Sequence, residues 1–183
     1  MKCLRFLLVL SSFFFSAQSW AQTKKIYLAP DDHTDFIWSA TEHDSYAAFI
    51  AQLDYFLGQI AITSSEAART QAKFSTDGSL WLKTYRDGSS KVSPAVGPGA
   101  NWSTLIARMQ DGHIVSPLIP LVVTWGAVPA EGVLRSLYFP GHLERTHGVH
   151  FPVAQAMEKH DAAARRGVAL RRRWGEVFLA RGL

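Results

Sequence analysis

The chain has 183 residues, of which 48% are hydrophobic and 12% aromatic, and its formal net charge is +4. That length can bury the core of one domain, and so many aromatic residues exclude a disordered, solvated chain. Residues 159–183 hold seven Lys and Arg against two acidic residues, so the first 158 residues carry a net charge of −1. The basicity belongs to a C-terminal tail and does not identify an acidic partner.

Residues 1–21 have the pattern of a secretory signal peptide. Two basic residues precede a short apolar run, and the small residues Ser19 and Ala21 predict cleavage before Gln22. We expect export to the periplasm or the extracellular space, with no stable membrane anchor after cleavage; an uncleaved anchor is the alternative. Cleavage removes the only cysteine, Cys3, which excludes disulfides and thiolate metal sites from the mature chain.

The apolar spacing of the mature chain predicts alternating strands and helices. In chain order, these are a strand at 24–29, a helix at 42–62, a strand at 72–76, helices at 79–86 and 101–111, a strand at 113–124, a helix at 129–148 and a strand at 149–156. Thr41 is the predicted N-cap of the first helix, and Pro140-Gly141 should kink or split the last one. This order indicates an α/β protein with mostly parallel strands.

A polar loop follows the first predicted strand, with the sequence DDHTDFIW over residues 31–38. His33 and Asp35 are two residues apart, so on an extended segment their side chains point to the same side. An imidazole nitrogen and a carboxylate suit zinc, and Trp38 offers a flat apolar face to a sugar ring. The alternatives are an ordinary polar loop and a core tryptophan. Asp77, at the end of the second predicted strand, either forms a turn with Gly78 or supports a metal ligand.

The stretch IYLAPDDHTDFIW resembles the opening of the catalytic domain of glycoside hydrolase family 38, the α-mannosidase type. That family has an apolar strand that runs into an H-x-D-x-G-W loop. His33 and Asp35 match its zinc ligands and Trp38 matches its sugar-contacting aromatic residue, whereas Ile37 replaces its glycine. A looser similarity continues to Glu158 and includes an A-E-x-x-x-R pattern at residues 130–135.

The resemblance implies a partial (β/α) barrel-like fold of the α/β class over residues 22–158, and retaining hydrolysis of glycosidic bonds with Zn²⁺ as the metal. Glu158 falls near the position of the family's nucleophile, but the family residue is Asp and the following Pro-Phe-Gly pattern is missing. An exposed glutamate that opens a helix is the other interpretation of Glu158. A further zinc-binding histidine of the family lies beyond the end of this chain.

Residues 159–183 change abruptly to a composition rich in Ala and Arg. This tail is a basic helix on a membrane or nucleic acid, a solvated terminal helix, or an out-of-frame translation of GC-rich DNA. A long open frame in another register of the gene would support the third interpretation.

Two functions are consistent with these features. The first is a fragment of a secreted, zinc-dependent glycosidase that acts on carbohydrate. The resemblance to α-mannosidases implies a role in mannose metabolism. The second is an inactive, carbohydrate-binding remnant of the same fold. A nucleic-acid partner is not expected for an exported chain. We do expect self-association, because a sheet that is cut partway exposes an unpaired edge.

Overall fold

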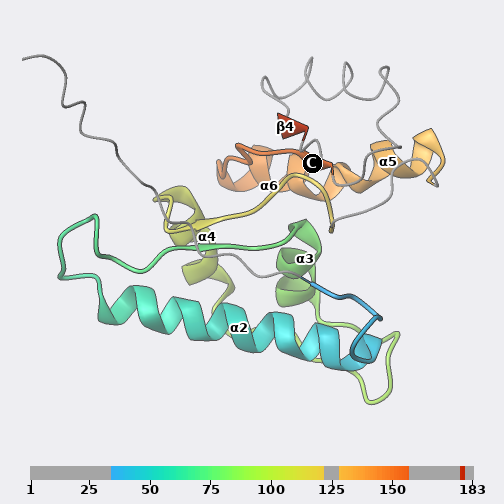
Figure 1. Ribbon diagram of the computed structural model, residues 1–183, viewed down its shortest axis with the longest axis horizontal. Coiled ribbons are helices and arrows are strands. Elements are labelled where there is room, and N and C mark those ends of the chain that lie inside the picture. The colour runs from blue at the N-terminus through green and yellow to red at the C-terminus, as the bar shows by residue number, and fades with distance from the viewer. Residues whose placement is uncertain (1–33, 122–127, 157–177, 180–183) are drawn as a thin grey trace, which may run out of the picture.

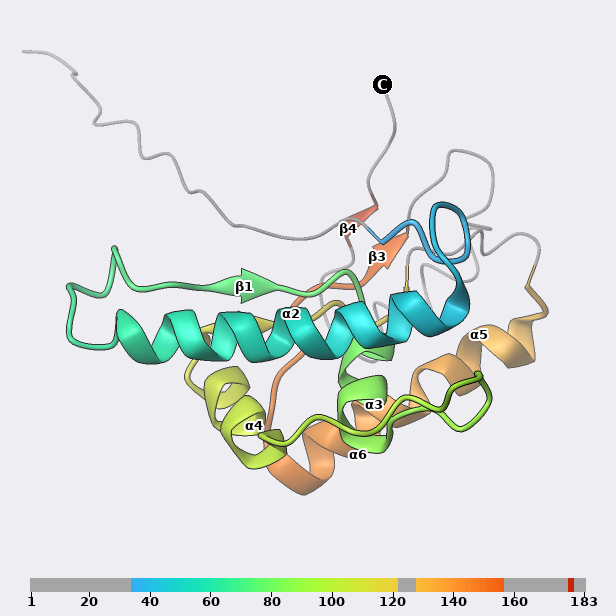
Figure 2. The ribbon, with the colours of Figure 1, turned by 90° about the horizontal axis from the view of Figure 1, so that it is seen from below.

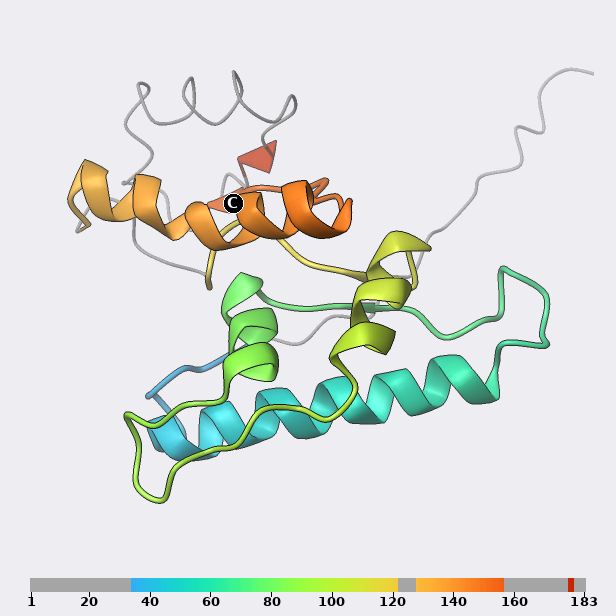
Figure 3. The ribbon, with the colours of Figure 1, turned by 180° about the vertical axis from the view of Figure 1, so that it is seen from behind.

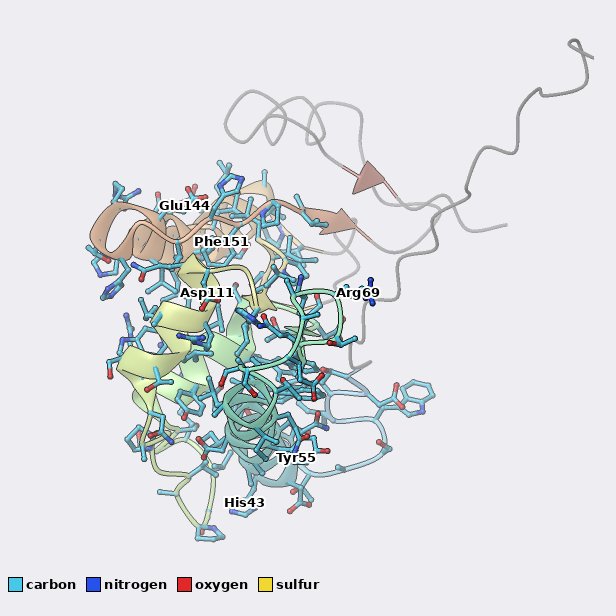
Figure 4. The ribbon with its side chains drawn as sticks, turned by 90° about the vertical axis from the view of Figure 1, so that its left-hand side faces the viewer. His43, Tyr55, Arg69, Asp111, Glu144 and Phe151 are labelled. Atoms are coloured by element: carbon cyan, nitrogen blue, oxygen red, sulfur yellow. The ribbon has the colours of Figure 1, made fainter. Side chains whose placement is uncertain are left out.

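The computed structural model describes residues 34–121, 128–156 and 178–179 of the chain. Helix α2 forms one side of the molecule, α5 and α6 form the opposite side, and α3 and α4 lie between them (Figures 1 and 3). Figure 4 shows the same layers, with Tyr55 on α2, Asp111 at the end of α4, Glu144 on α6 and Phe151 after α6. The described elements are mostly helical, and their strands are short.

Helix α2 spans Glu42–Ile62, the range that the apolar spacing predicts. The predicted N-cap is confirmed: the Thr41 hydroxyl accepts a hydrogen bond from the Asp44 amide at 3.1 Å, and the Asp44 carboxylate accepts one from the Thr41 amide. This reciprocal pair satisfies amides that the helix start leaves unpaired. The buried residues of α2 recur every three or four positions and form one face, namely Ser45, Phe49, Leu53, Leu57 and Ile60.

Strands β1 (Phe74–Ser75) and β2 (Ile114–Val115) pair in parallel, with Phe74 opposite Ile114. Strand β1 runs alongside α2, where the rings of Phe74 and Phe56 stack with centroids 3.9 Å apart (Figure 2). The parallel pairing agrees with the expected strand direction. The predicted strand at 113–124 is nevertheless too long, since β2 ends at Val115.

The chain after β2 closes over the start of α3 (Ser79–Asp87) instead of continuing the sheet. The amides of Ser79 and Leu80 donate to the carbonyls of Ile119 and Pro120, each at 2.8 Å. These bonds satisfy two amides at the helix start. A side chain at Gly78 would lie 2.1 Å from the Pro120 carbonyl oxygen, so this close approach requires glycine.

Helix α4 (Trp102–Gln110) lies within the predicted helix at 101–111 and buries Leu105, Ile106 and Met109. The predicted helix at 129–148 is two helices, α5 (Ala130–Ser136) and α6 (Tyr138–His147).

The predicted helix is split, as expected, but the break lies at Leu137, three residues before Pro140. Pro140 lies in the first turn of α6, where its missing amide costs no intrahelical bond. Gly148 ends α6 in the left-handed conformation with φ 63°, as expected for a helix stop.

The last described strands, β3 (Gln155–Ala156) and β4 (Phe178–Leu179), form a second parallel pair. The predicted strand at 149–156 is therefore confined to its last two residues. The predicted first strand at 24–29, the signal peptide at 1–21 and most of the tail lie outside the described residues. Within the described ranges, no helix combines the length and apolar character needed to cross a membrane. The (β/α) barrel stays a prediction.

Candidate functional site

Residues 34–38, called the 34–38 loop below, lie against the carboxyl end of β1. The amide of Thr34 donates to Oδ2 of Asp77 at 2.9 Å, although the two residues are 43 positions apart. Asp77 is the second residue after β1 and is buried, with 7% of its surface exposed. The loop after the predicted first strand thus meets the end of β1, which is where ligands gather in α/β proteins.

A second set of contacts fixes the loop from the side of α2 and α3. Trp81 donates from its indole nitrogen to Oγ1 of Thr34 at 3.0 Å. The Trp81 ring stacks on Phe49 with centroids 4.6 Å apart, and Phe49 in turn stacks on Phe36 at 6.3 Å. Thr34 and Phe36 therefore attach the loop to the core.

The loop turns sharply between Asp35 and Trp38. The Trp38 amide donates to the Asp35 carbonyl at 3.0 Å, and Ile37 at the third position of this turn has φ 62°. A positive φ at that position is typical of a type II turn, which favours glycine. A β-branched residue there is strained, because its Cβ crowds the backbone.

Attached and exposed side chains alternate along the loop. Thr34 and Phe36 are partly buried, whereas Asp35 and Ile37 are exposed. Trp38 is 89% exposed, so the interpretation of Trp38 as a core residue is wrong, while its contact with a sugar stays a prediction. A carboxylate and an indole are thus presented to solvent three residues apart on a loop whose other side is held.

The other predicted site residues cannot be placed. His33 and Glu158 lie outside the described residues, so their roles as zinc ligand and nucleophile stay predictions. In the part of the chain that is described, no group of three or more His, Cys, Asp or Glu side chains is arranged to hold a metal ion. Asp35 is the one predicted zinc ligand whose position is known, and an exposed carboxylate is a suitable donor for that ion.

A second polar cluster, which the sequence analysis missed, connects α2, α3 and the start of α4. The buried Tyr85 donates its hydroxyl to Asp54 in a short hydrogen bond, and the same hydroxyl accepts from the Asn101 amide at 3.1 Å. Burial, followed by the hydrogen bond to Asp54, raises the pKa of Tyr85 to about 12. The phenol therefore stays protonated at neutral pH and serves as a structural donor.

A third cluster ties the segment before β1 to the start of β2. His113 contacts Oδ1 of Asp111 through Nδ1 at 2.7 Å and Oε1 of Gln71 through Nε2 at 2.9 Å. Gln71 donates its amide nitrogen to two backbone carbonyls, which turns its oxygen toward His113. These contacts hold strand ends in place and are distant in sequence from the 34–38 loop.

The remaining residues singled out from the sequence have ordinary structural contacts. Glu131 and Arg135 are four residues apart and pair along α5 at 2.7 Å, and both are well exposed. His150 lies 3.7 Å from Glu144 at the end of α6.

The sequence contains little that predicts which residues contact the 34–38 loop. Asp77-Gly78 reads as a turn, and nothing local relates it to Thr34. Phe36, the one apolar residue between His33 and Ile37, could have been recognised as an anchor.

Comparison of the chain with protein-family models, curated proteins and solved structures finds no match.

Proposed function

We propose that the chain is the N-terminal part of a secreted, zinc-dependent retaining glycoside hydrolase resembling α-mannosidases. In this proposal His33 and Asp35 hold the zinc ion and Trp38 contacts the sugar. Zinc, when bound, supplies a Lewis acid that holds substrate hydroxyls. The observation that carries the proposal is the backbone of Ile37.

Ile37 occupies the position at which the resembled H-x-D-x-G-W loop has glycine. Its φ of 62° lies in the left-handed region, which glycine adopts without strain and isoleucine does not. The chain thus makes a turn suited to glycine at the one position where its sequence departs from the loop pattern. This supports a shared loop conformation that the isoleucine has not changed.

The accessibility of the loop supports a carbohydrate ligand. Trp38 leaves 89% of its surface to solvent, although a large apolar ring is normally buried. Sugar rings have apolar faces that can pack on such an indole while their hydroxyls remain solvated. Asp35, also exposed, lies close enough in sequence to face the same ligand.

The alternative is an inactive remnant that binds carbohydrate without a metal. The exposure of Trp38 favours this function as much as the first, because stacking on an indole requires no zinc. The two proposals differ in one measurable property, which is the dependence of sugar binding on zinc.

The zinc content of the purified chain tests the metal site. We expect a stoichiometric amount of zinc in the wild type and its loss in His33→Ala, because catalytic zinc sites depend on each protein ligand. His43→Ala is the matched control, since His43 lies on α2 and contacts Asp44 at 3.3 Å. A wild type that binds no zinc would contradict the first proposal.

Binding of methyl α-mannoside, measured by tryptophan fluorescence with and without a chelator, separates the alternatives. Binding that is lost in Trp38→Ala and also lost with the chelator supports the zinc-dependent site. Binding that is lost in Trp38→Ala and unchanged by the chelator supports the remnant. Equal binding by wild type and Trp38→Ala would contradict both.

A further inference from the structure

Asp77 is a buried carboxylate at the junction of β1 and α3. A turn between a strand and a helix does not by itself require a carboxylate. Burying a charged group is unfavourable unless hydrogen bonds compensate it. The amide of Thr34 donates to Oδ2 of Asp77 at 2.9 Å. A hydrogen bond to an ionised acceptor is stronger than one between neutral groups. Asp77 thus provides a strong attachment point for a backbone amide from another part of the chain.

Thr34, whose amide binds Asp77, is also held through its side chain. Trp81, 1% exposed, donates its indole N–H to Oγ1 of Thr34 at 3.0 Å. Trp81 lies one turn along α3 from the junction that carries Asp77, and its ring is fixed by stacking on Phe49. Asp77 before α3 and Trp81 in its first turn therefore bind the backbone and the side chain of Thr34 at once.

Thr34 stands between the two predicted zinc ligands in the sequence and immediately precedes Asp35. Because neighbouring residues of an extended segment point to opposite sides, a Thr34 that is fixed inward directs Asp35 outward. Thr34 is partly buried and Asp35 is exposed, and the turn that begins at Asp35 then leaves Ile37 and Trp38 exposed as well. The direction of Asp35 is consequently set at Thr34.

We infer that Asp77 is a positioning residue of the proposed site: through Thr34, and together with Trp81, it orients the 34–38 loop so that Asp35 and Trp38 face the ligand. This inference rests on the proposed function. Asp77 contributes no atom to the ligand in this arrangement. Its effect is to hold the loop in the binding conformation before the ligand arrives, which lowers the cost of ordering the loop on binding.

Hydrogen exchange of the full chain, without any ligand, tests the positioning itself. In Asp77→Ala we expect amide exchange in peptides that cover residues 34–38 to become about tenfold faster or more, because the charge-assisted bond is lost. Asp77→Asn retains an acceptor oxygen and should restore most of the protection. Unchanged exchange in Asp77→Ala would overturn the inference.

Ser116→Ala is the matched control for a general loss of stability. Ser116 is buried at the same end of the strand pair and accepts from Oγ1 of Thr76 at 2.8 Å, without contacting Thr34. We expect this variant to leave the exchange of residues 34–38 unchanged. If the loop in Ser116→Ala exchanges as fast as in Asp77→Ala, the effect is ordinary destabilisation and the inference is overturned.

Zinc titration of the same variants connects the positioning to the site. With Zn²⁺ as the probe, we expect affinity to fall at least fivefold in Asp77→Ala, to recover in Asp77→Asn and to stay unchanged in Ser116→Ala, as supporting groups of metal ligands generally show about this effect or more. If the wild type binds no Zn²⁺, the proposed function fails, and the exchange experiment alone decides whether Asp77 positions the loop. If Zn²⁺ binds equally to wild type and Asp77→Ala, the positioning role is overturned while the zinc proposal stands.

Discussion

Phe49 on α2 and Trp81 on α3 stack face to face, with ring centroids 4.6 Å apart and ring planes inclined by 19°. Both side chains are buried, with 2% and 1% of their surfaces exposed. The stack joins the two helices, and the indole nitrogen at its edge binds Thr34 of the 34–38 loop. One side chain thus contributes both to the core and to the attachment of the candidate site.

Truncating Trp81 should separate these two contributions. We expect Trp81→Ala to lower the free energy of unfolding by about 3–5 kcal/mol, because a buried indole leaves a large cavity. Trp81→Phe keeps a ring on Phe49 but loses the hydrogen bond to Thr34. Loss of that bond should lower the free energy of unfolding by about 1 kcal/mol, and the smaller ring should add a further packing loss. Equilibrium urea unfolding measures both values. Trp38→Ala is the control at an 89% exposed position, and a loss there of more than about 0.5 kcal/mol would contradict the described exposure.

Replacing Ile37 by glycine should stabilise the chain. The left-handed conformation at φ 62° costs a residue with a Cβ about 1–2 kcal/mol, which glycine avoids. Glycine also has a more flexible unfolded state, which offsets about 0.4–1 kcal/mol of that gain. We therefore expect a net increase of about 0.5–1 kcal/mol in the free energy of unfolding, measured by urea denaturation.

Ile37→Ala is the matched control for this substitution. It removes the same exposed side chain but keeps the Cβ that causes the strain, so it should not reproduce the gain. Equal stabilisation by glycine and alanine would show that the isoleucine side chain, and not the backbone conformation, is responsible.

Much of the helical structure could be predicted from local spacing. The range and the N-cap of α2 follow from Thr41 and from the recurrence of Phe49, Leu53 and their neighbours. Helix spacing, caps and turn residues are properties of a few consecutive positions, and the sequence displays them directly.

The strands were predicted less well because their extent depends on hydrogen bonds to other segments. Residues after Val115 are apolar enough for a core strand, and Leu118 and Ile119 are indeed fully buried. Pro117 and Pro120 lack the amides that would continue a ladder, and the carbonyl of Ile119 accepts from the start of α3 instead. The burial of the residues after Val115 could thus be predicted, whereas their hydrogen bonding to the start of α3 could not.

The hydrogen bonds that attach the 34–38 loop could not be predicted either, because they too join segments that are far apart in the sequence. Thr34 and Asp77 are 43 residues apart, and neither has a neighbour that indicates the other. Asp35 and Trp38 could be predicted as site residues from their chemistry. Asp77 and Trp81, which hold the loop, could be identified only from the structure.

Stability should fall between pH 10 and pH 12 through the buried Tyr85 and the partly buried Tyr46. Burial, with hydrogen bonds to Asp54 and Glu42 respectively, raises the pKa of Tyr85 and of Tyr46 to about 12 each, from an ordinary value near 10. Below pH 10 both phenols are protonated in the folded and unfolded chains, so the stabilisation is fully present. Above pH 10 the unfolded chain loses these protons first, and the free energy of unfolding decreases up to about pH 12.

Unfolding by urea across this pH range checks the prediction. Tyr85→Phe should flatten part of the decrease, and the double variant with Tyr46→Phe should flatten more of it. At pH 7, Tyr85→Phe should also cost about 1–3 kcal/mol, since Asp54 and the Asn101 amide lose a buried partner. A double variant with the wild-type slope would contradict the assignment.

Asp87 should give the opposite dependence in acid. The hydrogen bond from Arg86, at 2.6 Å, and that from Lys83, at 2.7 Å, outweigh partial burial and lower the pKa of Asp87 to about 2. A lowered carboxyl pKa stabilises the folded chain above the unfolded value of 3.8, and this contribution is lost as the pH falls from about 4 to 2. The side chain of Asp87 is 34% exposed, so solvent screens the pair and the contribution at pH 7 should be under about 1 kcal/mol.

Asp87→Asn should therefore lower the free energy of unfolding slightly at pH 7 and not at pH 2, and the difference between the two chains should close over pH 4 to 2. Glu131→Gln is the control at pH 7, because the Glu131–Arg135 pair is at least 65% exposed and should contribute almost nothing. Arg86 also lies over the Phe139 ring, 4.7 Å from its centroid, which joins α3 to α6. If the Asp87→Asn difference persisted undiminished at pH 2, the carboxylate would act through this packing contact and not through its charge.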